Sequence, residues 1–230
     1  MKIITNHKLI KRNKIIGQIT TFASLGVLGL GLYLSFKQTY ISWSFAALLT
    51  GFLLSQVGIY YGSRWGKSPR PDERLNQALK GLDNKYTLYH YNSPVPHLLI
   101  GPAGIWTLIP YAQSGRISYD EKNARWKQAG GNAYLKIFAQ EGLGRPDLEV
   151  QSFEKSMNKY LQNVFKDFNP IPESSTVLVF TNEKASLEAE TASRPTLPAK
   201  KVKEYFRRQA KDNTLNSELL NILERVLPAE

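Results

Sequence analysis

Two long uncharged segments dominate the hydrophobic pattern of the chain. No charged residue lies between Lys14 and Lys37, and none lies between Lys37 and Arg64. The hydrocarbon core of a bilayer is about 30 Å thick and needs roughly 20 helical residues, at about 1.5 Å each, to cross it. Both segments are long enough, and the short link at residues 37–40 requires antiparallel neighbours. The pattern therefore predicts two transmembrane helices within residues 15–62.

The residues that flank these segments predict the orientation of the hairpin. Aromatic side chains of the kind that gather at membrane interfaces bracket the second segment: Tyr40, Trp43, Tyr60, Tyr61 and Trp65. Five basic residues precede the first segment and three follow the second, whereas Lys37 stands alone in the link. The positive-inside rule then places both termini in the cytoplasm. We expect a multi-pass protein of the cell membrane with a basic cytoplasmic N-terminus at 1–14, spans at 15–62 and a linker at 63–71.

A secretory signal peptide is the alternative interpretation of the first segment. The apolar region of such a peptide is about 7–15 residues long and ends at a cleavage site of the Ala-x-Ala type. The first segment is longer, lacks such a site and leads directly into a second apolar segment, so the hairpin is favoured. Within the second segment Gly58 and Gly62 form a small-xxx-small pair, for which packing within the hairpin is favoured over dimerisation.

Beyond the linker, the hydrophobic period alternates between that of helices and that of strands. A helix is expected from Asp72, with Leu75, Leu79 and Leu82 as its apolar stripe. The other expected elements are strands at 86–91, 97–100, 105–109, 115–119 and 176–180, a polar loop at 183–198, and helices at 148–165, 198–211 and 214–226. This order indicates one α/β domain at 72–182, followed by a loop and C-terminal helices at 183–230.

The charge of the chain is concentrated beside the apolar segments. The net charge is +11, from 30 basic and 19 acidic residues. Residues 1–70 contain nine basic and no acidic residues, which leaves 21 basic and 19 acidic residues in 71–230. The domain is therefore nearly neutral and lacks the overall basic footprint of a nucleic-acid-binding domain.

Several classes of chemistry are excluded or disfavoured by the residue types of the chain. It has no cysteine, which excludes disulfides, thiolate metal sites and cysteine nucleophiles. Its three histidines, His7, His90 and His97, share no helical spacing, which disfavours a histidine zinc site. No Gly-x-Ser-x-Gly elbow exists for serine catalysis. We expect His90 and His97 to be strand residues with hydrogen-bond partners.

Residues 97–111 contain two short apolar runs joined by a tight turn. They read His-Leu-Leu-Ile-Gly-Pro-Ala-Gly-Ile-Trp-Thr-Leu-Ile-Pro-Tyr and are followed by Gln-Ser-Gly-Arg-Ile at 113–117 and by Trp126. This segment resembles the nuclease-related domain (NERD) family, in which a strand, a Gly-Pro-x-Gly turn and a second strand precede a glycine, a basic residue, isoleucine and tryptophan. Glu73 also falls where the family has an acid on its first helix. The resemblance spans roughly residues 70–182 and implies a restriction-endonuclease-like mixed sheet flanked by helices.

The fold that this resemblance implies holds Mg²⁺ with an acid from the first helix, an aspartate before one strand and a Glu-x-Lys motif at the end of the next. The carboxylates converge on the metal, which polarises the phosphate and activates water, and the lysine orients the nucleophile. The resemblance places these positions at Glu73, Pro96, Ile109 and Tyr111. Of these only Glu73 offers a carboxylate, and residues 86–118 contain no Asp or Glu. We therefore expect a nuclease-like domain that has lost its metal site, with no catalytic residue, metal or cofactor.

Two other groups of residues are candidate sites. Asp147 and Glu149 lie at the start of the helix expected at 148–165, where helix capping is favoured over a metal role. The one dense basic cluster of the domain consists of Lys200, Lys201, Lys203, Arg207, Arg208 and Lys211. Three interpretations of this cluster stay open: a solvated helix face, contact with anionic lipid headgroups and, least favoured, nucleic-acid binding.

The leading hypothesis is a membrane-anchored, catalytically inactive nuclease-like domain that serves as a binding or scaffolding module at the inner face of the membrane. Its expected partners are the lipid bilayer and an unidentified protein. One alternative is an active Mg²⁺-dependent nuclease with relocated ligands, Glu73, Asp147 and Glu149. The other is nucleic-acid binding without cleavage, through the basic helix at 200–211.

Overall fold

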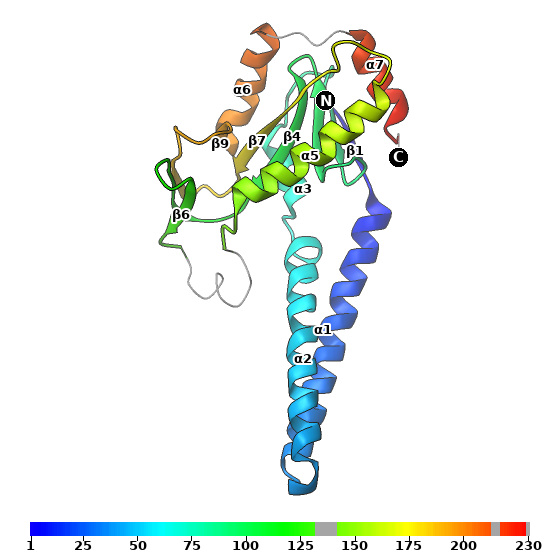
Figure 1. Cartoon of the computed structure of the whole chain (residues 1–230), viewed down its shortest axis with the longest axis vertical. Coiled ribbons are helices and arrows are strands. Elements are labelled where there is room, and N and C mark those ends of the chain that lie inside the picture. Colours follow the sequence, from blue (N-terminus) through cyan, green and yellow to red (C-terminus); the bar gives the residue numbers. More distant parts are fainter. Residues whose placement is uncertain (132–141, 213–216, 229–230) are drawn as a thin grey trace. The chain divides into compact units, whose positions relative to one another are not determined.

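The computed structural model describes residues 1–131, 142–212 and 217–228, with the backbone alone at 212, 217 and 218. The chain divides into two compact units, which are described separately (Figure 1). His7–Arg70 forms a helical unit. Met1–Asn6 and the chain from Pro71 onward form an α/β unit.

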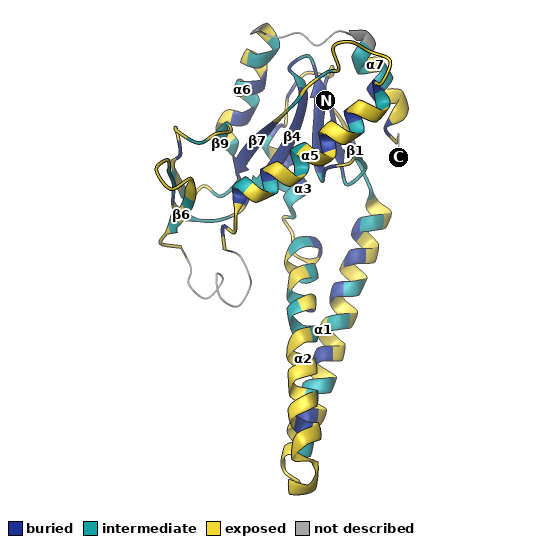
Figure 2. Ribbon diagram, in the orientation of Figure 1, coloured by how far each residue is buried: buried dark blue, intermediate teal, exposed yellow. Residues whose placement is uncertain are grey.

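Two long antiparallel helices make up the helical unit. These are α1 (His7–Ser35) and α2 (Ile41–Tyr61), which are joined through a 3₁₀ turn, η1 (Gln38–Tyr40), and followed by a π-helical turn, η2 (Gly62–Gly66). Both are long and apolar enough to cross a membrane, and only 17% of the most apolar window of each is buried. Most of their large apolar side chains are exposed (Figure 2). A core helix of a soluble protein buries its apolar face, so α1 and α2 do not have the burial of core helices.

Small residues line the contact between α1 and α2. They recur every seven residues on both helices: Gly17, Ser24 and Gly31 on α1, and Ser44, Gly51 and Gly58 on α2. This spacing keeps them close to one face of each helix, and all of them are buried. The Ser44 hydroxyl donates to the Gly31 carbonyl oxygen across the contact, at 2.7 Å.

The glycines of this contact show how closely the two backbones approach. A Cβ atom at Gly58 would lie 2.6 Å from the Thr21 hydroxyl oxygen, and one at Gly51 would lie 2.7 Å from Cγ of Leu28. Gly58 therefore packs within the hairpin, as predicted. Gly62 differs, since a Cβ there would have no described atom within 4 Å, so the two residues of the small-xxx-small pair do not share one contact.

A six-stranded mixed sheet forms the centre of the α/β unit. Its strands, in spatial order, are β1 (Lys2–Thr5), β2 (Thr87–His90), β3 (His97–Gly101), β4 (Gly104–Tyr111), β7 (Ser174–Phe180) and β9 (Thr196–Pro198). β2, β3 and β4 are antiparallel neighbours, whereas β1 pairs with β2, β7 with β4 and β9 with β7 in parallel. A smaller sheet, in the order β6–β5–β8, contains β5 (Gly115–Asp120), β6 (Arg125–Ala129) and β8 (Ala185–Glu188).

Helices cover both faces of the large sheet (Figure 1). α3 (Pro71–Ala78) and α6 (Ala199–Asp212) pack on one face, and α5 (Pro146–Val164) and α7 (Ser217–Val226) pack on the other. Successive strand residues point to opposite faces, so Leu88 joins the α3–α6 core while its neighbour Tyr89 joins the α5–α7 core. The predicted α/β fold, with a mixed sheet between helices, is confirmed.

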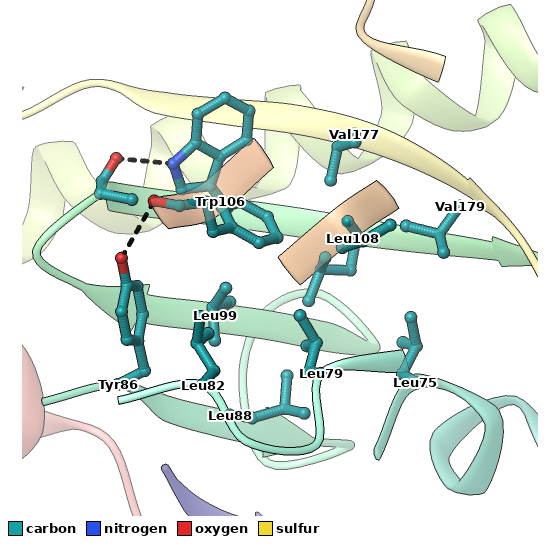
Figure 3. Close-up of a cluster of buried hydrophobic side chains, with 13 residues drawn as sticks. Leu75, Leu79, Leu82, Tyr86, Leu88, Leu99, Trp106, Leu108, Val177 and Val179 are labelled. Carbon is teal, nitrogen blue, oxygen red and sulfur yellow. Dashed lines mark hydrogen bonds between the residues drawn. The ribbon is translucent and has the colours of Figure 1, made fainter. Parts of the chain in front are cut away.

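The Gly-Pro-Ala-Gly segment makes the turn between β3 and β4, as predicted. A Cβ at Gly101 would come within 2.3 Å of Cδ1 of the Tyr86 ring. Gly104 has a φ of +108°, which residues with a side chain rarely adopt. The Trp106 indole N–H donates to the Ala103 carbonyl oxygen at 2.7 Å and closes the turn (Figure 3). The fold alone therefore accounts for both glycines.

The N-terminal part of the chain differs from the sequence-based expectation. Helix α1 begins at His7, so the basic terminus expected at 1–14 contains β1 and the first turns of α1. The expected linker at 63–71 begins within η2. At about 1.5 Å per residue, the 29 residues of α1 span roughly 43 Å, which is more than a hydrocarbon core of about 30 Å. The helix therefore continues into its basic flank.

The C-terminal part differs in its short strands. Residues 183–198, expected to be a loop, contain β8 and β9, which have four and three residues. Strands this short show little of the alternation on which strand prediction depends. The helix expected at 214–226 is α7, which begins at Ser217, and residues 213–216 lie outside the described residues.

Strand β1 ties the residues before α1 into the α/β unit. It pairs in parallel with β2, from Lys2 opposite Thr87 to Thr5 opposite His90. Ile4 is 4% exposed and belongs to the core on the α5 face. The sheet is therefore completed by residues that precede the helical unit in the chain.

Deleting residues 2–5 should destabilise the α/β unit, because it removes the ladder along β2 and the buried side chain of Ile4, worth about 1.5–3 kcal/mol. Hydrogen exchange on the full-length protein in detergent should show faster exchange of the β2 amides and unchanged exchange in α2. Ile3→Ala is the control, since Ile3 is 44% exposed. Undiminished protection of β2 in the deletion variant would contradict the β1–β2 pairing.

Gly58→Ala should weaken the hairpin by about 1–3 kcal/mol, because the added Cβ meets Thr21. Gly29→Ala is the matched control, since a Cβ at Gly29 has no described atom within 4 Å and alanine favours helix. Unfolding of the full-length protein in mixed detergent micelles measures both variants. Equal stability of the two would show that the helices do not approach as described.

Candidate functional site

The four positions at which the sequence resemblance would place metal ligands are Glu73, Pro96, Ile109 and Tyr111. Glu73 is in the first turn of α3, and Pro96 directly precedes β3. Ile109 and Tyr111 are on β4, 2% and 6% exposed, and both belong to an apolar cluster with Leu178 of β7. The two side chains at the Glu-x-Lys positions are therefore part of the hydrophobic core.

Two carboxylates from the first turn of α5 lie beside the edge of the sheet where β4 ends. The Tyr111 hydroxyl donates to Oε2 of Glu149 at 2.8 Å, and the Trp126 indole N–H donates to Oδ1 of Asp147 at 3.1 Å. The first turn of a helix favours carboxylates, because the helix dipole is positive there. Each of the two carboxylates thus accepts a hydrogen bond from a neutral aromatic side chain.

Core packing holds the Tyr111 ring in place. Phe180, the last residue of β7, stacks on Tyr111 with ring centroids 5.2 Å apart, and on Trp126 at 6.5 Å. The backbone N–H and the hydroxyl of Thr181 both donate to the Tyr111 carbonyl oxygen, at 2.7 and 3.0 Å. The carboxyl ends of β4 and β7 are therefore held together, and the Tyr111 hydroxyl has a defined position.

Burial raises the pKa of the Tyr111 hydroxyl, and the negative charge of Glu149, its hydrogen bond with Glu149 and the charge of Asp147 raise it further. The phenol therefore keeps its proton in the folded protein. It acts as a donor to Glu149 and supplies no anionic oxygen to a metal. This edge of the sheet carries two carboxylates and a neutral phenol.

The part of the chain that the structure describes contains no group of three or more His, Asp or Glu residues that could hold a metal ion. Glu73 therefore does not join Asp147 and Glu149 in the relocated ligand set. Helix capping, the role that the sequence favoured for Asp147, is also wrong. The residue at the cap is Arg145, which makes no side-chain cap hydrogen bond, and Asp147 bonds to Trp126 instead.

Sequence reasoning missed the contact between Tyr111 and Glu149, although the chain contains a signal for it. The strands expected at 105–109 and 176–180 have one long helix between them, as in a parallel β–α–β crossover. The helix of such a crossover runs back along the sheet, so its first turn lies near the carboxyl end of the first strand. That rule places Glu149 beside the end of β4.

The structure brings the six basic residues of the predicted cluster together on α6. Lys200, Lys203, Arg207 and Lys211 recur at helical spacing, and Lys201 and Arg208 flank this row. On the opposite side of the helix Val202 and Phe206 are fully buried in the core. All six basic residues except the half-buried Lys203 are exposed.

Four of these six side chains make polar contacts that are described in the structure. Lys200 pairs with Glu183 at 3.1 Å, and Arg208 pairs with Glu204 one turn away. The Lys203 ammonium donates to the Lys80 carbonyl oxygen at 3.3 Å, and the Arg207 guanidinium donates to the Gly81 carbonyl oxygen at 3.1 Å. The last two contacts tie α6 to the chain just after α3.

His90 and His97 face one another across β2 and β3. Their Nδ1 atoms are 2.8 Å apart, and His90 Nε2 donates to Oδ1 of Asn76 at 3.0 Å. A carbonyl oxygen only accepts, so His90 Nε2 carries a proton, and in the neutral pair His97 Nδ1–H donates to His90 Nδ1. Both histidines are buried strand residues with partners, as predicted.

No family model, curated protein or solved structure matches the chain.

Tyr111→Phe should destabilise the α/β unit by about 1–2 kcal/mol near neutral pH, because Glu149 loses its donor. Above pH 10 the difference from the wild type should narrow. The reason is that unfolded Tyr111 loses its proton there, whereas the folded residue, with its raised pKa, does not. Denaturant unfolding of the full-length protein in detergent at several pH values measures both effects.

Tyr119→Phe is the matched control, because the Tyr119 ring packs against Trp126 and its hydroxyl has no hydrogen bond among the described residues. It should change the stability by less than about 0.5 kcal/mol. A Tyr111→Phe variant as stable as this control would show that the bond to Glu149 contributes nothing.

Proposed function

We propose that this protein is a membrane-anchored, non-catalytic binding module whose α/β unit is a degenerate, restriction-endonuclease-like member of the nuclease-related domain family. The order of elements supports the scaffold: α3, the antiparallel strands β2, β3 and β4, then α5 and the parallel strand β7. The resemblance likewise implies one helix before these strands and one helix after them. The Gly-Pro-Ala-Gly turn joins two adjacent strands, as the resemblance requires.

The hydrogen bonding of Asp147 and Glu149 carries the proposal that the module is not catalytic. A Mg²⁺ site needs several oxygen ligands in a near-octahedral arrangement. Here the side chains at the Glu-x-Lys positions are Ile109 and Tyr111, and the nearby carboxylates accept bonds from neutral donors. A metal would have to displace those donors from the core, where the Tyr111 ring is stacked on Phe180.

Membrane anchoring follows from α1 and α2. The chain enters the hairpin from the α/β unit and returns to that unit after it, since β1 precedes α1 and α3 follows α2. Two crossings return the chain to the side it left, so both ends lie on the same side of the membrane. The eight basic residues of the two flanks, against Lys37 alone in the link, favour the cytoplasmic side.

The basic face of α6 is the surface that we propose for binding. It carries six basic residues and only Glu204 as an acid among them. Anchoring keeps the unit within reach of an anionic leaflet, whose surface attracts such a face by about 1 kcal/mol per basic residue. The nearly neutral charge of the α/β unit argues against nucleic acid as the partner.

Purified full-length protein in detergent should show no DNA cleavage on addition of Mg²⁺ or Mn²⁺, because the described residues include no group of three ligands that could hold a metal ion. Duplex DNA should bind only weakly at physiological salt. In nanodiscs, the α6 amides should exchange more slowly when the phosphatidylcholine contains phosphatidylserine. Gel-based cleavage, filter binding and hydrogen exchange measure the three properties.

The alternative of an active nuclease is favoured by one observation, the presence of Asp147 and Glu149 together beside Tyr111. Metal-dependent cleavage that Glu149→Gln abolishes would establish this alternative and refute the non-catalytic module.

Tight, steeply salt-dependent DNA binding that disappears when the six basic residues of α6 become Gln would instead establish nucleic-acid binding. Unchanged exchange of α6 in anionic nanodiscs would rule out the leaflet as its partner.

A further inference from the structure

A cavity of about 540 Å³ opens at the carboxyl ends of β7 and β9. Its wall includes Arg74 and Lys80, from α3 and the turn after it, Asn182 just beyond β7, and Lys200 and Lys203 at the start of α6. Cavities that bind small molecules have volumes of roughly 300–1,000 Å³, so this one has room for a small organic ligand. Ligands of open α/β sheets commonly bind outside the carboxyl ends of parallel strands, which is where this cavity lies.

The lining of the cavity is strongly basic. It contains Arg74, Lys80, Lys200 and Lys203 but only one acid, Glu183. The pair between Glu183 and Lys200, at 3.1 Å, is exposed on both sides and engages one of the three N–H groups of the lysine. The Lys203 ammonium likewise gives one N–H to the Lys80 carbonyl oxygen and keeps two. In a nearly neutral α/β unit, a lining with four basic residues and one acid favours an anionic ligand.

Other features of the lining indicate the kind of anion. Ala78, Pro198 and Ala199 provide an apolar wall, which suits the organic part of a ligand and not a bare inorganic ion. Several lysines around one cavity act as point charges and suit a phosphate group, which carries more charge than a single carboxylate. The first turn of α6 contains no acidic residue that would compete for these cations.

We propose that this cavity binds a phosphorylated organic molecule, with its phosphate group held between the lysines of α6 and the basic residues at and after α3. The molecule is either a soluble phosphate ester or the headgroup of an anionic phospholipid, since both present the same chemistry. The proposal names the ligand class of the binding module and so rests on that function. It concerns other residues than the Tyr111 edge, so it can fail while the module remains non-catalytic.

Isothermal titration of full-length protein in neutral detergent with inorganic pyrophosphate tests the proposal. The wild type should bind saturably, and Lys200→Gln with Lys203→Gln should weaken binding by about tenfold or more. Lys201→Gln with Arg208→Gln is the matched control, because it removes the same charge from the same helix outside the cavity. The control should weaken binding by about twofold or less. Lys200→Gln alone keeps the hydrogen bond from Lys203 to the Lys80 carbonyl oxygen and should lower the affinity for pyrophosphate by an intermediate factor.

The source of the phosphate group is distinguished in nanodiscs. With phosphatidylcholine alone, pyrophosphate should bind as in detergent. If added phosphatidic acid abolishes pyrophosphate binding in the wild type, the ligand is a lipid headgroup, and if binding persists the ligand is soluble. Equal weakening by the cavity variant and by the control would overturn the proposal, because a general surface potential would then explain the binding. Absence of binding in detergent and in both nanodiscs would overturn it as well.

Discussion

Parallel pairing joins β4 to β7, from Ile105 opposite Ser174 to Tyr111 opposite Phe180, and this ladder positions the parts of the candidate site. It stacks the last ring of β7 on the last ring of β4. It also requires a connection that returns across the sheet, which brings the first turn of α5 to the carboxyl end of β4. One strand pair thus brings together the aromatic rings, the carboxylates of α5 and, through Asn182, the wall of the basic cavity.

The Tyr111 edge has the composition of a hydrophobic core. The polar groups of an active site usually lower the stability of the fold, and favourable interactions elsewhere in the protein compensate for the lost stability. Here Ile109 and Tyr111 extend the apolar cluster around Leu178 to the end of the sheet. Asp147 and Glu149 are the polar groups that remain, and each has a neutral partner. The edge therefore stabilises the fold, while the basic cavity lies beside α6.

The parts of the fold that the sequence predicts are those with strong local patterns. The buried strands around the Gly-Pro-Ala-Gly turn, the apolar stripe of α5 and the basic face of α6 are visible in residue spacing alone, and Gly101 and Gly104 mark the turn for steric reasons. The parts it missed depend on tertiary packing. β1 and β9 are short edge strands without a clear period, Glu149 meets Tyr111 only through the crossover, and Arg74 reaches the cavity of Lys200 only because α6 packs beside α3.

The position of β1 imposes an order on biosynthesis. Ile4 leaves the ribosome before either long helix, but its partner Tyr89 emerges only after both long helices have been made. Until then β1 has no neighbouring strand with which to pair. Synthesis of both long helices thus comes before closure of the sheet, and the nascent α/β unit stays open at one edge for the whole of that interval.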